Sequence, residues 1–314
     1  MTILVSGLVL ASCSQKQGSD NPLLQTWDTP FETAPFEKIK VEHYLPAFEA
    51  AMAEHDKEIQ AIIDNAEAPT FDNTIAALDY SGQTLTKVAG VFYNMMAANT
   101  SEELQKVNEQ IGPMMATHSD NVSMNAKLFE KIKAVYDAKD SQKYTGEQLA
   151  LLEKTYKQFV RSGALLDAEK QAELREVNAE LTKVEAKFDA NLLKETKSYQ
   201  LVIDNQENLK GLPQGEIEKA AALAKQEGKE GKWIFTLDNP SFIPFVTYAD
   251  NRDLRKEIFN ARVNRCNNGG ETDNNELVAQ MAELRAKKAQ LLGYETFAHY
   301  QLEERMAKEP KAVF

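Results

Sequence analysis

The chain has 314 residues, of which 43% are hydrophobic and 27% are charged, so it is long enough to bury a sizeable core. It carries 48 acidic and 36 basic residues and a formal net charge of −12, which repels phosphate backbones and argues against nucleic-acid binding. Only 14 Gly and 10 Pro occur, and this composition favours helix over strand.

The N-terminus resembles a bacterial lipoprotein signal. Residues 1–13 form an apolar run too short to span a bilayer, and polar residues follow at once. The run ends in Leu10-Ala-Ser-Cys13, the pattern at which lipoproteins are cleaved and lipidated, although no Lys or Arg precedes it. An apolar terminus without function is the alternative. We predict a signal peptide and tether over 1–20, lipidation at Cys13, and a bacterial cell-envelope location, periplasmic or surface, with membrane contact only through the lipid anchor.

The region from about residue 41 to 198 has an almost continuous helical pattern. In its first helix, Leu45, Phe48 and Met52 recur at helical spacing. After the break at Ala68-Pro69, a residue among 72–74 is suited to cap the next helix. The apolar spacing predicts helices over 43–63, from about 72 to 92, and over 102–118, 124–139 and 145–162.

The longest predicted helix runs from Asp167, a plausible N-cap, to about residue 197. Its apolar residues recur at intervals of three and four and form a narrow seam. A dimerising coiled coil is one interpretation; a long helix packed antiparallel within its own domain is the other, and the short seam favours it. The seam consists of Leu174, Val177, Leu181, Val184, Phe188 and Leu192.

Residues 199–237 contain the only pattern that is not helical. Two short strands are predicted at 199–204 and 233–237, with a turn and a helix between them. The helical pattern then returns, and Gly293 is suited to end a helix. The predicted fold is mostly α, with long helices and a small two-strand β element. The helices in this part are predicted at 214–227, 251–264, 273–292 and 294–306.

The four histidines do not form a zinc motif. His43, His55, His118 and His299 are followed by Tyr, Asp, Ser and Tyr, so the sequence contains no His-Glu-x-x-His. We expect each histidine to be a packed or surface residue. Cys266 lies in a turn-like segment and is interpreted as a free surface thiol.

Other candidate residues have ordinary structural explanations beside functional ones. Five methionines between Met95 and Met124 suit either core packing or an adaptable peptide-binding surface. Arg252 and Arg255 are placed to bind a substrate carboxylate or to form salt bridges within their own helix turn. Surface ion pairs at i, i+4 are expected for Glu153 with Lys157, Glu283 with Lys287, and Glu304 with Lys308.

Four ordered segments carry a family resemblance. They are Pro69-Thr-Phe-Asp-Asn-Thr74 with its continuation to Gly82, Leu209-Lys-Gly-Leu-Pro213, residues 248–257, and residues 276–307 with Leu-Leu-Gly-Tyr294 and Arg305-Met-Ala307. Together they resemble the M3 family of zinc metallopeptidases, the family of thimet oligopeptidase and the peptidyl-dipeptidases, and most closely the peptidyl-dipeptidase branch. The resemblance covers about residues 21–314.

This resemblance implies a two-lobed, mostly helical peptidase whose lobes enclose a channel for short unfolded peptides, from which C-terminal dipeptides are released. In that family two histidines of His-Glu-x-x-His and a later glutamate hold zinc, and none of these residues maps onto this sequence. We therefore expect 21–314 to be the N-terminal helical region of a truncated peptidase, inactive alone and without catalytic or metal residues, with zinc only in the full-length parent.

Two other classes of function stay open. One is a non-catalytic helical lipoprotein that binds peptides or a protein partner, and the other is a structural envelope protein. If the catalytic half normally covers the last helices, some of their apolar residues should be exposed and should promote association. These residues are Leu291, Leu292, Phe297, Tyr300, Leu302 and Met306.

Overall fold

A computed structural model describes residues 20–314. The predicted lipidation site Cys13 and the predicted signal peptide lie outside this range. Within it, none of the helices has the length and apolar character needed to cross a bilayer.

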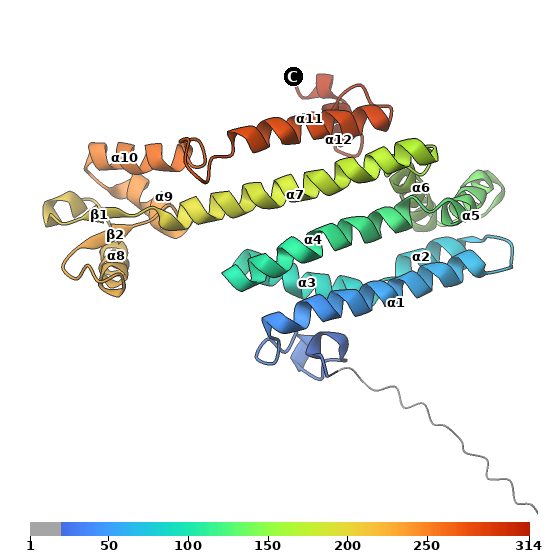
Figure 1. Cartoon of the computed structure of the whole chain (residues 1–314), viewed down its shortest axis with the longest axis horizontal. Helices are drawn as coiled ribbons and strands as arrows, with labels where there is room; N and C mark the ends of the chain where they lie inside the picture. Colours follow the sequence, from blue (N-terminus) through green and yellow to red (C-terminus); the bar gives the residue numbers. More distant parts are fainter. Residues whose placement is uncertain (1–19) are drawn as a thin grey trace, which may run out of the picture.

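Four long helices define the architecture. α1 (Tyr44–Asp64), α4 (Glu102–Ser123), α7 (Ala168–Ser198) and α11 (Asn275–Leu291) lie side by side in chain order, from the blue to the red side of the molecule (Figure 1). At 1.5 Å per residue α7 is about 46 Å long. It packs against α4 on one flank and α11 on the other, within its own fold, and this confirms the second interpretation of its seam.

Shorter elements complete the two ends. α5 and α6 pack together at one end, and the β-strands with α8, α9 and α10 gather at the other (Figure 1). The bounds are α2 (Ala77–Tyr80), α3 (Gln83–Ala98), α5 (Ala126–Asp137), α6 (Gly146–Arg161), β1 (Leu201–Ile203), α8 (Gln214–Gln226), β2 (Trp233–Phe235), α9 (Asn239–Tyr248), α10 (Arg252–Val263) and α12 (Phe297–Leu302).

The helix starts follow from their capping residues. The side chain of Asp167 accepts a hydrogen bond from the Lys170 backbone N–H at 2.9 Å, as its predicted N-cap role requires. The hydroxyl of Ser101 caps α4, and Thr145 forms a capping box with Gln148 at the start of α6.

The two strands pair antiparallel, as predicted. Leu201 lies opposite Phe235, and Ile203 lies opposite Trp233. This small sheet packs on α8, α9 and α10 through a cluster that includes the buried residues Phe245 and Ile258. The fold is mostly α with one two-stranded sheet, which confirms the predicted fold class.

Two further apolar clusters hold the helices. One joins α1, α3 and α4 around Phe48 and Phe92, whose rings meet edge to face with centroids 5.5 Å apart. The other joins the C-terminal part of α1 to α5 and α6 and contains the fully buried residues Leu128, Ile132 and Leu152.

The structure corrects the helix predictions at three places. The helix expected over 72–92 is interrupted at Ser81 and Gly82, because Gly82 takes a left-handed φ of 70° and starts α3 afresh. No helix was predicted over 239–248, where α9 lies. Pro240 stands in the first turn of α9, where the missing N–H needs no partner. The last helix is only Phe297–Leu302 instead of 294–306, and turns follow it.

Candidate functional site

A groove between α4 and α7, which we call the α4–α7 groove, mixes apolar and charged groups. The part of it next to α3 has a volume of about 450 Å³. The end of α3 closes it with Tyr93 and Met96, and Ala190 and Leu193 of α7 form the opposite wall. An adjoining hollow of about 730 Å³ continues along the same two helices.

Charge is distributed unevenly along the α4–α7 groove. Asp189 lines the part next to α3 with Tyr93 and Met96; although the residue is exposed, partial desolvation, reinforced by the charge of Glu185, raises the pKa of its carboxyl. The adjoining hollow is lined by four lysines of both helices and by the carboxylates of Glu102, Glu109 and Glu271. Apolar walls with charges at intervals match the chemistry of an extended peptide, which offers side chains together with charged ends. The lysines are Lys106, Lys187, Lys194 and Lys197.

The five methionines contribute to core packing, and two of them also line hollows on the surface. Met124 is buried, and Met95 and Met114 pack against the cluster around Phe48. Met96 packs there too and also lines the α4–α7 groove, while Met115 lines a neighbouring hollow beside Tyr93. The groove thus has flexible thioether groups in its wall.

The histidines occupy three different environments. The ring of His43 accepts the Lys40 backbone N–H at 3.0 Å, and the exposed ring of His299 contacts the Thr296 hydroxyl at 2.9 Å. The other two histidines meet, which their separation of 63 residues in the sequence did not indicate. No group of three His, Cys, Asp or Glu side chains that could hold a metal ion occurs among residues 20–314.

The pair of His55 and His118 forms a chain of hydrogen bonds between α1 and α4. His55 Nδ1 lies 2.9 Å from His118 Nε2, His118 Nδ1 lies 3.4 Å from Asp56 Oδ1, and His55 Nε2 lies 3.1 Å from Ser81 Oγ. The Ser81 hydroxyl donates to the Leu78 carbonyl at 2.7 Å, so His55 Nε2 donates to Ser81. His55 Nε2 then donates to Ser81, and His118 Nδ1 donates to Asp56. The contact between the two rings needs a third proton, one more than two neutral imidazoles carry.

A second polar cluster lies between α4, α7 and α11. Asp120 is only 9% exposed, and the side-chain amide of Asn178 donates to its two oxygens at 2.9 and 3.2 Å. Lys288 donates to the Asn178 carbonyl oxygen at 2.8 Å. Burial raises the pKa of Asp120 and lowers the pKa of Lys288. The amide therefore links two charged groups that line a cavity of about 370 Å³.

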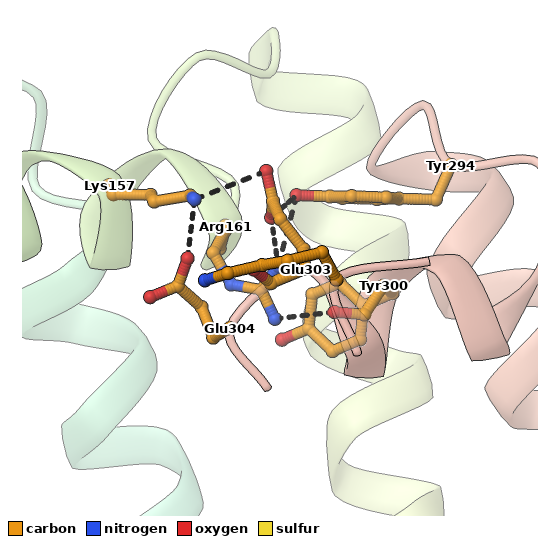
Figure 2. Close-up of polar contacts among 7 residues, drawn as sticks. Lys157, Arg161, Tyr294, Tyr300, Glu303 and Glu304 are labelled. Atoms are coloured by element: carbon orange, nitrogen blue, oxygen red, sulfur yellow. Dashed lines mark hydrogen bonds and ion pairs between the residues drawn. The ribbon is translucent and has the colours of Figure 1, made fainter. Parts of the chain in front are cut away.

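A junction centred on Arg161 fixes the segment that follows α11 (Figure 2). The Arg161 guanidinium donates to the Tyr300 carbonyl at 2.8 Å and to the Tyr294 hydroxyl at 3.2 Å, and it forms an ion pair with Glu303. Its charge lies 4.2 Å from the centre of the Tyr300 ring. The Tyr294 hydroxyl donates to Glu303 at 2.6 Å, and burial and this contact raise the pKa of Tyr294 to about 12.

The junction explains part of the sequence pattern at 293–303. Gly293 takes a φ of 82° and ends α11, and this directs Tyr294 towards α6. The same pattern carried the family resemblance, but the role of Arg161 had no sequence signal, because its partners lie more than 130 residues away.

Several predicted contacts of charged residues were wrong. In residues 20–314 Arg252 and Arg255 form no ion pair; Arg255 donates to the backbone carbonyls of Ala249 and Asp250 instead. The three predicted i, i+4 pairs are replaced by contacts between elements. The observed pairs are Lys139 with Glu153, Lys157 with Glu303 and Glu304, and Lys287 with Glu173.

The prediction that Cys266 is a surface thiol was wrong, because the residue is only 5% exposed. Burial and the neighbouring Glu195 carboxylate raise the pKa of its thiol to about 11. A thiol with such a pKa is protonated at neutral pH and is a poor nucleophile.

Comparison with known proteins gives two family matches. Residues 48–171 match "Neurolysin/Thimet oligopeptidase, N-terminal domain", and residues 245–314 match "Peptidase family M3". The first range contains α4 and the end of α3, which form one wall of the α4–α7 groove. The second contains α11 and the segment held by Arg161.

Individual relatives agree with these matches. The chain is 34% identical to the dipeptidyl carboxypeptidase of Escherichia coli over 93% of its own length and 43% of the relative. It is 30% identical to oligopeptidase A of the same organism, over 93% of its own length and 43% of the relative. It is 30% identical to the organellar oligopeptidase A of Arabidopsis thaliana, over 94% of its own length and 37% of the relative. The chain spans less than half the length of these relatives. The chain thus matches two models of the M3 peptidases and is similar to the N-terminal half of these relatives.

Proposed function

We propose that this chain forms the N-terminal part of a zinc metallopeptidase that resembles the dipeptidyl carboxypeptidases. The whole protein hydrolyses short unfolded peptides and releases dipeptides from their C-termini. The observation that carries this proposal is the α4–α7 groove, one wall of which lies in the segment similar to the N-terminal domain of neurolysin and thimet oligopeptidase. In this proposal the groove forms part of the wall along which a peptide substrate lies.

Zinc does not fit the residues that the structure describes. Residues 20–314 offer no set of three metal-binding side chains, and His55 and His118 direct their facing nitrogens at each other at 2.9 Å. The full sequence contains no His-Glu-x-x-His. We therefore assign no catalytic step to any residue of this chain, and the proposed zinc site belongs to other residues of a longer protein.

A first experiment tests the groove. Short labelled peptides are titrated with the purified chain and binding is followed by fluorescence anisotropy. Ala190→Trp places a bulky ring in the groove and should weaken binding by at least about tenfold, or about 1.4 kcal/mol. Ala222→Trp, on the exposed face of α8, is the matched control and should bind like the parent chain. Equal binding by both variants would remove the groove from the proposal.

A second experiment tests catalysis directly. The purified chain is assayed for bound zinc and for cleavage of a short peptide, with and without a chelator. We expect neither zinc binding nor cleavage. Stoichiometric zinc together with chelator-sensitive cleavage would overturn the claim that this chain is inactive alone.

The second candidate function is a non-catalytic helical lipoprotein that binds peptides or a protein partner. The α4–α7 groove favours it, because peptide binding there requires no metal. The DNA beyond the codon for Phe314 separates the two candidates. An open frame that encodes His-Glu-x-x-His supports the peptidase, and a stop codon supports the binding protein.

The proposed location is the bacterial cell envelope, with lipid attached to Cys13. The support is the sequence Leu10-Ala-Ser-Cys13. Metabolic labelling with a tagged fatty acid tests it. Label should enter the parent chain and be absent from Cys13→Ser, and label in both proteins would count against lipidation at this residue.

A further inference from the structure

The loop between α10 and α11 is organised by one carboxylate that the proposed function does not use. Glu195 of α7 accepts hydrogen bonds from the Cys266 backbone N–H at 2.8 Å, the Asn268 side-chain amide at 2.6 Å and the Thr272 hydroxyl at 2.7 Å. Both carboxylate oxygens are engaged, and the loop closes over α7.

Asn268 has a distinctive neighbour within this loop. It is the only asparagine in the sequence that is followed by glycine. Because glycine has no side chain, the backbone nitrogen of Gly269 can approach the side-chain carbonyl carbon of Asn268 with little steric hindrance. Gly269 takes a φ of 74°, and no atom outside its immediate neighbours would touch a Cβ there. The chemistry for cyclisation between the two residues is therefore present.

The folded loop restrains every group that takes part in this cyclisation. The Gly269 N–H donates to Asp273 Oδ2 at 2.7 Å, and the Asn268 amide nitrogen is held by Glu195. The Asn268 side-chain oxygen accepts the Gly270 N–H at 3.2 Å. All three contacts must break before the Gly269 nitrogen can turn towards the Asn268 carbonyl carbon.

We propose that Asn268 is a deamidation site. Hydrogen bonds to Glu195 and Asp273 keep it unreactive in the closed loop, and it reacts when the loop opens. The Gly269 nitrogen gives its proton to hydroxide and attacks Cγ of Asn268. A carbon–nitrogen bond forms, the bond from Cγ to the side-chain nitrogen breaks, and that nitrogen takes a proton from water and leaves as ammonia. Water then adds to either carbonyl carbon of the cyclic imide, the bond from that carbon to the ring nitrogen breaks, and the nitrogen takes a proton, which yields aspartate or isoaspartate.

The product cannot restore the loop. An amide that donated to Glu195 at 2.6 Å becomes a second carboxylate, which has no proton to donate and is repelled by Glu195 at neutral pH. The contact from the Cys266 N–H to the same carboxylate is weakened with it. Deamidation therefore exposes the Cys266 thiol, which is buried in the intact loop.

The test is deamidation of the full chain, followed by peptide mass mapping during incubation at mildly alkaline pH. In the native protein Asn268 should react at least about tenfold more slowly than in denaturant, which corresponds to a loop-opening free energy of about 1.4 kcal/mol. In Asp273→Asn an NH2 group replaces one of the two oxygens that accept from Gly269 and Asn275, so the restraint on Gly269 weakens and much of the denatured rate should be recovered. Glu195→Gln should act in the same direction. Circular dichroism establishes that both variants are folded.

Glu271→Gln is the matched control, because it removes a carboxylate of the same loop that pairs only with Lys194 on the surface. It should react like the parent chain. Equal rates in native and denatured protein, or equal rates in Asp273→Asn and Glu271→Gln, would overturn the guarded site. Alkylation of Cys266, read from its own peptide, should be faster in the deamidated fraction. An unchanged alkylation rate would overturn the proposed opening of the loop.

Discussion

His55 Nδ1 lies 2.9 Å from His118 Nε2, and the two rings connect α1 to α4 between Asp56 on one side and Ser81 on the other. The donors in this chain allow one excess proton. A second would point two N–H groups at each other across 2.9 Å. This relationship makes the contact between α1 and α4 sensitive to pH.

The first prediction concerns that sensitivity. Burial and the neighbouring His118 lower the pKa of His55 below 6.5, although Glu58 and Asp56 oppose the shift. The unfolded chain therefore binds this proton at higher pH than the folded chain, and stability falls as pH drops below about 6.5. Urea unfolding on either side of that pH measures the loss. His55→Gln should make it smaller, while His299→Gln, an exposed histidine, should not. An equal loss in His55→Gln and the parent chain would refute this assignment.

The second prediction concerns the junction in Figure 2. Arg161→Ala removes contacts with Tyr294, Tyr300 and Glu303, and should lower the free energy of unfolding by about 2–3 kcal/mol, less than for a fully buried pair because Glu303 is partly exposed. Arg161→Lys should recover only part of this stability, since an ammonium group lacks the planar, forked set of donors of the guanidinium.

Lys157→Ala is the control for Arg161, because it removes a charge from the same junction at a more exposed position. Its cost should stay below about 1 kcal/mol. Urea unfolding gives both values, and limited proteolysis should show earlier cleavage after α11 in Arg161→Ala. Equal costs for the two variants would mean that the fork geometry contributes nothing.

The third prediction concerns the amide between Asp120 and Lys288. Asn178→Ala leaves both charged groups without their hydrogen-bond partner in a largely buried site, and should cost about 1–3 kcal/mol. Asn121→Ala removes an amide that accepts only from Arg175 at the surface, and its effect should lie within about 0.5 kcal/mol. Thermal or urea unfolding compares them. Similar values would show that water replaces the Asn178 amide at little cost.

The fourth prediction separates two glycines with left-handed backbone. A Cβ on Gly211 would lie 2.1 Å from the Tyr248 carbonyl oxygen and 2.9 Å from the Asp250 nitrogen, whereas a Cβ on Gly228 would meet nothing within 4 Å. Gly228→Ala should cost about 1–2 kcal/mol for the conformation alone. Gly211→Ala should cost more than about 3 kcal/mol, because backbone must move as well. Unfolding curves that give the same cost would contradict the close approach.

The fifth prediction concerns association. Of the six apolar residues expected to be exposed near the C-terminal end, Met306 is 101% exposed, and the other five are half-buried. Phe259 and Val263 of α10 are also exposed, one turn apart. The chain should self-associate with concentration in light scattering. Phe259→Ser with Val263→Ser should reduce this, and Tyr80→Ser, also an exposed position, should not. A monodisperse parent chain at high concentration would count against the prediction.

Local patterns predicted most of the helices, because capping and apolar spacing act within a few residues. Asp167 correctly predicted where α7 begins, and the apolar residues from Leu174 to Val184 correctly predicted its buried face. The paired strands followed from the break in helical spacing. No helix was predicted over 239–248, although Pro240 stands in the first turn of α9, where proline is tolerated.

Long-range polar contacts were not predictable, because they depend on which helix faces meet. Nothing in the spacing of His55 and His118 indicates their contact, and Arg161 carries no signal for its two tyrosines. Lys157 was assigned to Glu153 four residues away, but a long side chain reaches Glu303 and Glu304 from another element just as easily. The groove likewise required the packing of α4 on α7 to be known.

The length of α7 has a mechanical consequence. One stretch of this rigid rod borders the groove at Asp189, another contacts Lys288 through Asn178, and its C-terminal turns hold the Cys266 loop through Glu195. Over about 46 Å, a tilt of about 5° about one end displaces the other by about 4 Å. If a ligand in the groove tilted α7 away from α4, the displacement would therefore be largest at the end of α7 farthest from the point about which it tilts.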